Sequence, residues 1–276
     1  MLTEGALEFI ELGQTGALVP EIGLGMWAYT GGDEPIHRGI QLGAFFLDTA
    51  ENYGTELAVG NAIKGRRDSV FVATKVSPTH FRGGDLKNAA EQSLKQLGID
   101  YIDLYQLHWP ERKTNFFGKL GYEHKENSNE WNNFESILIN LEKFIKQGKI
   151  RYIGLSNETP WGLSKFLEVS KLKSLPKMMS VQNAYNLLCR TYEIGIAEIS
   201  IREESGLLAY SPLAGGFLTG KYQNNNLPEN SRQKLFGDYY TRYNKPHASL
   251  VIEKYFNIAK KFALDFAQMS IKFCEI

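Results

Sequence analysis

Cysteine and the common metal-binding patterns are almost missing from this sequence. The chain has 276 residues but only 2 cysteines, Cys189 and Cys274. A disulfide framework is therefore not expected, and both thiols are expected to be small buried groups in a reducing compartment. No CxxC or HxH pattern occurs, so the sequence gives no support to a metal site.

Excess charge of either sign and long apolar runs are also absent. Lysine plus arginine and aspartate plus glutamate number 31 each, which argues against broad binding to nucleic acid or to an anionic membrane. No apolar run approaches the ~20 residues that span a bilayer, and residues 1–12 lack the basic start and apolar centre of a signal peptide. We therefore expect a cytoplasmic protein without a nucleic-acid or membrane partner. No feature of the sequence indicates its oligomeric state.

The sequence does contain a regular alternation of strand-like and helical patterns. Apolar residues share one helical face in 86–97, 134–145 and 163–170, and short apolar runs lie between such segments. This alternation predicts an α/β protein with a parallel sheet. An N-terminal β-hairpin is expected from 7–12 and 17–19. Seven inner strands are expected, at 22–25, 45–48, 70–75, 101–107, 150–155, 178–183 and 206–210.

Seven inner strands favour a (β/α)8 TIM barrel over an open sheet. Residues 1–276 are expected to form one barrel domain that is incomplete at its C-terminus, because the sequence stops in a helical segment without an eighth strand. Residues 215–247 contain few apolar residues and are expected to form an irregular, mobile excursion after the seventh strand, with the role of a lid. A helix is expected to follow at 251–262.

Four polar residues that can move or steady protons lie just after the expected strands. Asp48, Lys75 and His108 follow three separate apolar runs, and Tyr53 lies in the loop after Asp48. The C-terminal ends of barrel strands converge on one face, so these side chains are expected to meet. Tyr53 is then the candidate acid, because a nearby ammonium on Lys75 would lower a phenol pKa of about 10. Asp48 would hold Lys75, and His108 would donate a hydrogen bond that positions the group to be protonated.

Each of these residues also has an ordinary explanation. An Asp-Thr-Ala sequence is usually a capping turn, and a lysine after a strand is usually solvated. His108 lies between Leu107 and Trp109, where a histidine can simply be part of the core. Their joint occurrence at successive strand ends is what favours a catalytic group.

Six short motifs occur in order along nearly the whole chain. They are Gly23-Leu24-Gly25-Met26-Trp27, Asp48-Thr49-Ala50-Glu51-Asn52-Tyr53-Gly54, Ala73-Thr74-Lys75-Val76, Gln106-Leu107-His108-Trp109-Pro110, Ile153-Gly154-Leu155-Ser156-Asn157 and Tyr210-Ser211-Pro212-Leu213. Together they resemble the motifs of the aldo-keto reductase superfamily. Two longer stretches, 108–122 and 182–188, are similar to its Tas-like branch. The resemblance implies a (β/α)8 barrel enzyme that reduces a small aldehyde or ketone with NADPH.

The resemblance gives the four proton-handling residues the roles described above and adds a cofactor site. It implies that Ser156, Asn157 and Gln182 hold the nicotinamide amide, which needs both donors and acceptors. It also implies that Tyr210 stacks on the nicotinamide ring. Members of the superfamily continue into an eighth strand and helix that contribute to holding the adenosine 2′-phosphate. The preference for NADPH over NADH therefore rests on the resemblance alone, and NADH stays an alternative.

The loop after the seventh strand is the expected phosphate site, because barrels often bind phosphate there. Its candidate residues are Ser211, Leu213, Gly215 and Lys221, for which a solvated loop is the ordinary explanation.

Three aromatic residues near strand ends are expected to line the substrate pocket. They are Trp27, Tyr29 and Trp109. Aromatic side chains at such positions are also common in protein cores, so this second explanation stays open.

Two nucleotide-binding patterns are imperfect. Residues 215–221 match a P-loop, but Tyr222 follows where a Ser or Thr is needed. Residues 23–28 fit a relaxed dinucleotide fingerprint, but Gly31-Gly32 interrupts the helix that it requires. A different alternative stays open: a catalytically idle binding or regulatory subunit, or a truncated fragment, in which weak cofactor binding silences an intact catalytic group.

Overall fold

The structure is a computed structural model that describes residues 7–117, 121–126 and 132–275. Two earlier expectations fall partly outside the described residues. The Tas-like stretch includes residues 118–120, and the expected absence of a signal peptide concerns residues 1–6. The strands are β1 (Phe9–Glu11), β2 (Leu18–Pro20), β3 (Leu24–Gly25), β4 (Phe46–Asp48), β5 (Phe71–Val76), β6 (Ile102–Leu107), β7 (Ile150–Ser156), β8 (Met178–Ala184) and β9 (Gly206–Tyr210). The α-helices are α1 (Glu34–Gln41), α2 (Glu56–Ala62), α3 (Asp85–Leu97), α4 (Phe134–Lys146), α5 (Pro160–Lys173), α6 (Ile196–Arg202), α7 (Arg232–Phe236), α8 (Ala248–Lys261) and α9 (Phe266–Lys272).

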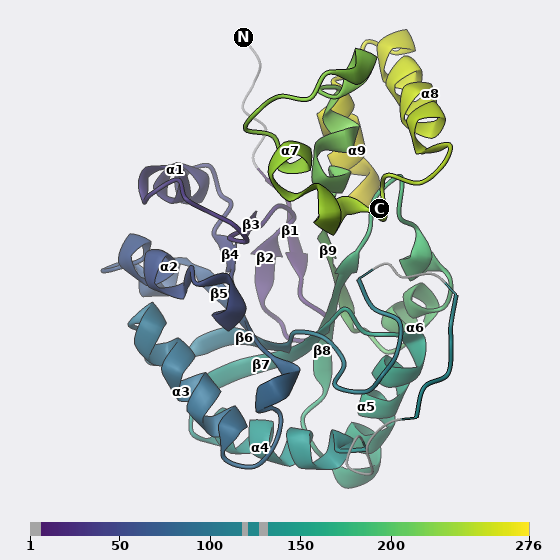
Figure 1. The fold of residues 1–276 in the computed structure, drawn as a ribbon. Coiled ribbons are helices and arrows are strands. Elements are labelled where there is room, and N and C mark those ends of the chain that lie inside the picture. Colours follow the sequence, from purple (N-terminus) through teal and green to yellow (C-terminus); the bar gives the residue numbers. More distant parts are fainter. Residues whose placement is uncertain (1–6, 118–120, 127–131, 276) are drawn as a thin grey trace.

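Seven strands form one curled parallel sheet. They pair in sequence order from β3 to β9, and every pairing in this sheet is parallel. Figure 1 shows the sheet curving round with α1 to α6 on its outer side. All residues of β5 and β6 are buried, as expected where a parallel sheet is covered on both faces. The predicted seven inner strands and the (β/α)8 type of architecture are confirmed. Among the described residues, the two edge strands β3 and β9 do not pair with each other, so the seven strands do not close into a ring.

The outer helices bury the apolar faces that the sequence periodicity predicts. In α3 the buried side chains include Leu86, Ala90 and Leu94, and the helix ends at Gly98, whose φ of 63° is the left-handed value that suits glycine. Helix α4 buries Phe134, Ile137, Leu138, Leu141 and Phe144. These faces pack with the outward side chains of the sheet in the largest apolar cluster of the molecule.

Helix α5 begins at a defined cap. The Thr159 side chain accepts a hydrogen bond from the Gly162 amide, and Pro160 occupies the first turn, where no amide donor is needed. We expect Thr159→Ala to lower the free energy of unfolding by about 1 kcal/mol in urea denaturation. Thr159→Ser keeps the acceptor oxygen and serves as the control, with the wild-type value expected. An equal loss in both variants would show that the cap is not the cause.

The hairpin of β1 and β2 covers the N-terminal ends of the sheet strands. Its residues Leu12 and Val19 pack with Phe46 and Phe71, which start β4 and β5. Gly13 has a φ of 56°, and a Cβ there would collide with the carbonyl oxygen of Met179. The amino end of the sheet is therefore closed by this hairpin, and the open end carries the C-terminal residues of the strands.

The segment after β9 is more regular than the sequence predicts. Within 215–247 the chain forms α7 and several 3-10 turns, including η7 (Gly237–Tyr240), so the expectation of an irregular excursion is wrong over these residues. Helix α7 forms because Ser231 caps it by accepting from the Lys234 amide. Tyr240 and Tyr243 are buried and pack with residues of α8 and α9 in a second apolar cluster. Figure 1 shows α7, α8 and α9 grouped beside β9 and apart from the outer helices.

In the described part of the chain, no helix has both the length and the apolar character required to cross a membrane.

Candidate active site

The four predicted proton-handling residues lie together at the C-terminal ends of three neighbouring strands. Asp48 ends β4, Lys75 lies near the end of β5, and His108 directly follows β6. The Lys75 ammonium is 2.5 Å from Asp48 Oδ1. It also lies 4.8 Å from the centre of the Tyr53 ring. The Tyr53 hydroxyl is 3.4 Å from His108 Nε2, so the predicted convergence is present in the structure.

Asp48 is held by three donors. Besides Lys75, its Oδ2 accepts from Gln106 Nε2 at 3.1 Å and from Gln182 Nε2 at 2.9 Å. The Lys75 ammonium also donates to the Thr49 carbonyl at 2.8 Å. The role of Gln106 was not predicted, although the two-residue period of a strand places it on the same side of β6 as His108. Gln182 was expected to face a nicotinamide amide, and in this structure its amide nitrogen is used by Asp48.

The pKa of Tyr53 moves in the direction opposite to the one predicted. Burial, first, and the negative charge of Asp48, second, raise the pKa of the phenol above its usual value. Burial and Asp48 outweigh any lowering of the phenol pKa by the Lys75 ammonium, which lies 4.8 Å from the ring centre. Burial also lowers the pKa of the fully buried Lys75, against the opposing effect of Asp48. Tyr53 is thus a protonated phenol at neutral pH, able to donate a hydrogen bond or a proton to a stronger base.

His108 is a neutral imidazole at pH 7. It is only 6% exposed, and burial together with the nearby Lys75 charge lowers its pKa to about 3. Among the described residues its Nδ1 is buried without a hydrogen-bond partner. The ring can therefore orient a polar group through Nε2, but it is not charged under ordinary conditions.

The lowered pKa of His108 has a consequence for acid stability. Because the unfolded chain binds a proton near pH 6.5 and the folded chain does not until about pH 3, stability is lost as the pH falls between these values. We expect the decrease in unfolding free energy from pH 7 to pH 4 to be about 3 kcal/mol smaller in His108→Gln than in the wild type. Urea denaturation at both pH values measures this, and equal decreases in the two proteins would contradict the assignment.

A hydrogen-bonded chain connects the candidate catalytic group with four of the predicted cofactor residues. Asn157 Nδ2 donates to the His108 carbonyl at 2.9 Å and to Ser156 Oγ at 3.1 Å. Asn157 Oδ1 accepts from the Tyr210 hydroxyl at 2.6 Å. Ser156 Oγ donates to the carbonyl of Gln182 at 3.0 Å. The structure thus brings Ser156, Asn157, Gln182 and Tyr210 to the same strand ends as Asp48, Lys75 and His108.

The loop after β9 has an unusual backbone. Ser211, Ala214, Gly215, Gly216 and Gly220 all have positive φ angles. A backbone in which left-handed and right-handed residues follow each other can turn successive N–H groups toward one anion. Leu213 lies within this loop, and Lys221 follows it with its ammonium 5.2 Å from the Tyr222 ring centre.

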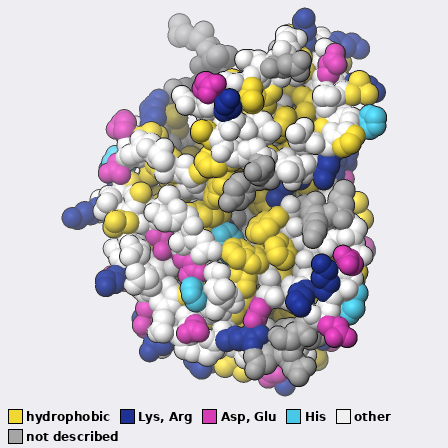
Figure 2. All heavy atoms as spheres, in the orientation of Figure 1, with side chains coloured by type: hydrophobic (Ala, Val, Ile, Leu, Met, Phe, Trp, Pro, Cys, Tyr) yellow, Lys and Arg dark blue, Asp and Glu magenta, His cyan; other side chains and the backbone are white. Residues whose placement is uncertain are grey.

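Of the three predicted pocket aromatics, Trp109 lies nearest the catalytic group. Its ring centre is 4.8 Å from that of His108 and 5.9 Å from that of Phe117. Trp27 instead packs against Phe236 of α7 at 5.3 Å, and the Tyr29 hydroxyl donates to the Gly32 carbonyl at 2.6 Å. In Figure 2, hydrophobic side chains gather in the middle of the face shown, around a hollow, with charged side chains spread around them.

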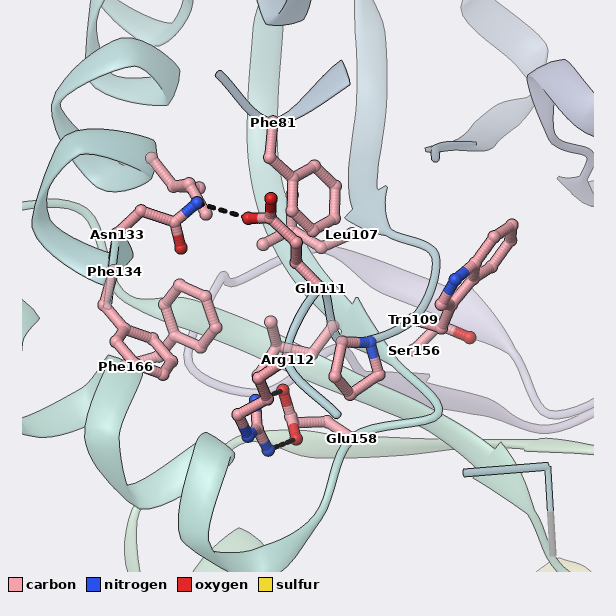
Figure 3. Close-up of a pocket in the computed structure, with 13 residues that line it drawn as sticks. Phe81, Leu107, Trp109, Glu111, Arg112, Asn133, Phe134, Ser156, Glu158 and Phe166 are labelled. Atoms are coloured by element: carbon pink, nitrogen blue, oxygen red, sulfur yellow. Dashed lines mark hydrogen bonds and ion pairs between the residues drawn. The ribbon is translucent and has the colours of Figure 1, made fainter. Parts of the chain in front are cut away.

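A buried ion pair joins the loop after β6 to the loop after β7. Arg112 forms a two-pronged pair with Glu158, with both side chains at least 92% removed from solvent. Figure 3 shows this pair at one side of a small pocket, with Glu111 and Asn133 joined at the other side and Trp109 directed away from both. His108 and Asn157 belong to the two joined loops, so the pair adds a second link to the direct hydrogen bond from Asn157 Nδ2 to the His108 carbonyl.

Comparisons with known proteins agree with this geometry. Residues 21–274 match the family model described as the aldo/keto reductase family. Protein tas of Escherichia coli is 39% identical over 266 residues, covering 87% of this chain and 75% of that protein. Methylglyoxal reductase YeaE of the same organism is 34% identical over 210 residues, covering 71% of this chain and 65% of that protein.

Solved structures agree as well. An aldo-keto reductase from Klebsiella pneumoniae in complex with NADPH has a TM-score of 0.67 and 25% identity, covering 95% of this chain and 79% of that one. The chain belongs to the aldo/keto reductase family.

Proposed function

We propose that this protein is an NADPH-dependent reductase that converts a small aldehyde or ketone to an alcohol, with Tyr53 as the proton donor. The observation that carries the proposal is the group of Tyr53, His108, Lys75 and Asp48 at one set of strand ends, where the Tyr53 hydroxyl is 3.4 Å from His108 Nε2 and Lys75 is 2.5 Å from Asp48. A phenol and an imidazole 3.4 Å apart could both reach one carbonyl oxygen, which supports the proposal. The NADPH-bound neighbour supports the same cofactor here.

The residues present fit NADPH. Within the described residues, Gln182 Nε2 is occupied by Asp48, but no hydrogen bond involves its Oε1, which can accept from an amide. Ser156 and Asn157 lie beside it through the hydrogen-bonded chain described above. The left-handed backbone of 211–220 and Lys221 supply donors and a positive charge that suit phosphate. When bound, NADPH supplies the hydride.

The protein's own residues then complete the reduction. As negative charge develops on the carbonyl oxygen, His108 Nε2 donates a hydrogen bond and holds the oxygen in place. Tyr53 transfers its proton to that oxygen, because an alkoxide is a stronger base than a phenolate even when burial raises the phenol pKa. The Lys75 ammonium, 4.8 Å from the Tyr53 ring centre, stabilises the phenolate that remains. Asp48 keeps Lys75 in this position.

Steady-state oxidation of NADPH by the purified protein, with benzaldehyde as a generic substrate, tests the proposal. We expect saturable turnover, with NADPH binding in the micromolar range by calorimetric titration. NADPH binding without turnover of any aldehyde or ketone would favour the alternative of an idle binding subunit. That alternative has one structural observation in its favour, since the amide groups of Asn157 are fully occupied within the protein. Absence of both binding and turnover would contradict the proposal.

A further inference from the structure

We infer that Arg242 binds an oxyanion beside Tyr210, either the carboxylate of an acidic carbonyl substrate or a phosphate of the cofactor. The inference rests on the proposed function. Arg242 lies in the segment between η7 and α8 and is not among the residues expected from the sequence to form the site. It is half-buried in the structure.

Arg242 is connected directly to the site. Its Nη1 donates to the Tyr210 hydroxyl at 3.2 Å. Its guanidinium carbon lies 5.8 Å from the Tyr210 ring centre and 5.7 Å from that of Tyr243. The Tyr210 hydroxyl in turn donates to Asn157, which donates to the His108 carbonyl. One chain of hydrogen bonds thus runs from the guanidinium to the loop that carries His108.

The charge of Arg242 is not balanced by the protein. In the parts of the chain that the structure describes, no carboxylate lies within ion-pair distance of it, whereas Arg67 pairs with Asp103 and Arg112 pairs with Glu158. Withdrawing a charge from water without a partner is costly. Four of the five guanidinium N–H donors are left, because only the bond to Tyr210 is formed among the described groups.

A guanidinium that lies near two aromatic rings is suited to carboxylate or phosphate oxyanions. Its donors form a rigid fork that matches carboxylate and phosphate oxygens in pairs, which an ammonium does not. The connection to Asn157 and His108 favours a carboxylate carried by the carbonyl substrate. The expected stacking of Tyr210 on nicotinamide makes a cofactor phosphate the second source of the same chemistry.

The test compares Arg242→Leu with Arg202→Leu, a matched control in which an exposed arginine paired with Glu198 is replaced. Circular dichroism and thermal unfolding first establish that both variants fold. Calorimetric titration of the protein without cofactor then measures affinities for benzoate and for inorganic pyrophosphate. A second set of measurements gives kcat/KM for 2-carboxybenzaldehyde and for neutral benzaldehyde, and the Kd of NADPH.

If the substrate supplies the anion, Arg242→Leu should weaken benzoate binding and lower kcat/KM for 2-carboxybenzaldehyde by about 10- to 100-fold. Benzaldehyde turnover and the Kd of NADPH should stay within about twofold. If the cofactor supplies it, pyrophosphate and NADPH binding should weaken by a similar factor, and the two aldehydes should be affected equally. If Arg242→Leu matches Arg202→Leu in every measurement, the inference is wrong.

The same measurements separate this inference from the proposed function. If the wild type binds benzoate or pyrophosphate through Arg242 but reduces no aldehyde, the anion site is supported and the proposed reductase function is contradicted. If the wild type reduces benzaldehyde and Arg242→Leu changes none of the measured affinities or rates, the reductase is supported and the anion site is contradicted. Arg242→Lys should recover only part of the lost affinity, because a lysine keeps the charge without the paired donors.

Discussion

Replacing Tyr53 with phenylalanine is expected to lower kcat for aldehyde reduction by about 10²- to 10⁴-fold, the usual contribution of a positioned acid. The substitution removes one hydroxyl, whose partner in the structure is His108 Nε2 at 3.4 Å. The ring stays in place, so its packing over Lys75 is preserved. Steady-state kinetics with NADPH and benzaldehyde measure the loss.

Cofactor binding provides the control for this prediction. Because Tyr53 makes no hydrogen bond to Ser156, Asn157, Gln182 or Tyr210 in the structure, the Kd of NADPH should stay within about twofold of the wild-type value. A matched variant, Tyr152→Phe, removes the hydroxyl of a tyrosine that donates to the Thr15 carbonyl at the opposite end of the sheet. It should leave kcat unchanged. Turnover by Tyr53→Phe at the wild-type rate would remove Tyr53 from its assigned role.

Replacing Asp48 with alanine is expected to destabilise the protein by about 3–5 kcal/mol, the usual cost of breaking a buried ion pair from one side. The Lys75 side chain is 0% exposed and that of Asp48 is 15% exposed, so the ammonium cannot turn to water when its partner is lost. Two amide donors, from Gln106 and Gln182, lose their acceptor as well. Urea denaturation measures the change.

Two further variants identify the cause of that destabilisation. The double variant Asp48→Ala, Lys75→Met removes both charges with a side chain of similar length, and it should recover a substantial part of the lost stability. Glu142→Ala breaks the exposed pair between Glu142 and Lys146 on α4 and should cost no more than about 1 kcal/mol. If Asp48→Ala is no more harmful than Glu142→Ala, the pair at the site does not stabilise the fold.

The positions of the residues proposed to be catalytic were predictable because they follow from a simple rule about parallel strands. Each of Asp48, Lys75 and His108 comes at the end of a recognisable apolar run, and neighbouring runs pair in sequence order. The buried faces of α3 and α4 were predictable for a similar reason, because their apolar residues recur with the 3.6-residue period of a helix. The assignment of a (β/α)8 type of fold required only the count and alternation of these elements.

The electrostatics of the site could not be predicted from the same patterns. A pKa depends on burial and on every neighbouring charge, and the sequence does not show that Asp48 would both pair with Lys75 and raise the pKa of Tyr53. The contact of Arg242 with Tyr210 was not expected because Arg242 lies in a segment without periodicity, where position along the chain says little about position in space. The short helix at Arg232–Phe236 was missed for the same reason, although Ser231 is a recognisable cap.

The backbone conformation and two hydrogen bonds together determine which amino acid suits position 157. Its φ of 54° is a left-handed value that asparagine tolerates better than most residues other than glycine. Its amide nitrogen donates to the His108 carbonyl, and its amide oxygen accepts from Tyr210. Aspartate would satisfy the backbone but supply no donor, and glycine would supply neither group. Asparagine joins a short side chain that tolerates this backbone with an amide donor and an amide acceptor, so Asn157→Asp and Asn157→Gly should each weaken the link between His108 and Tyr210.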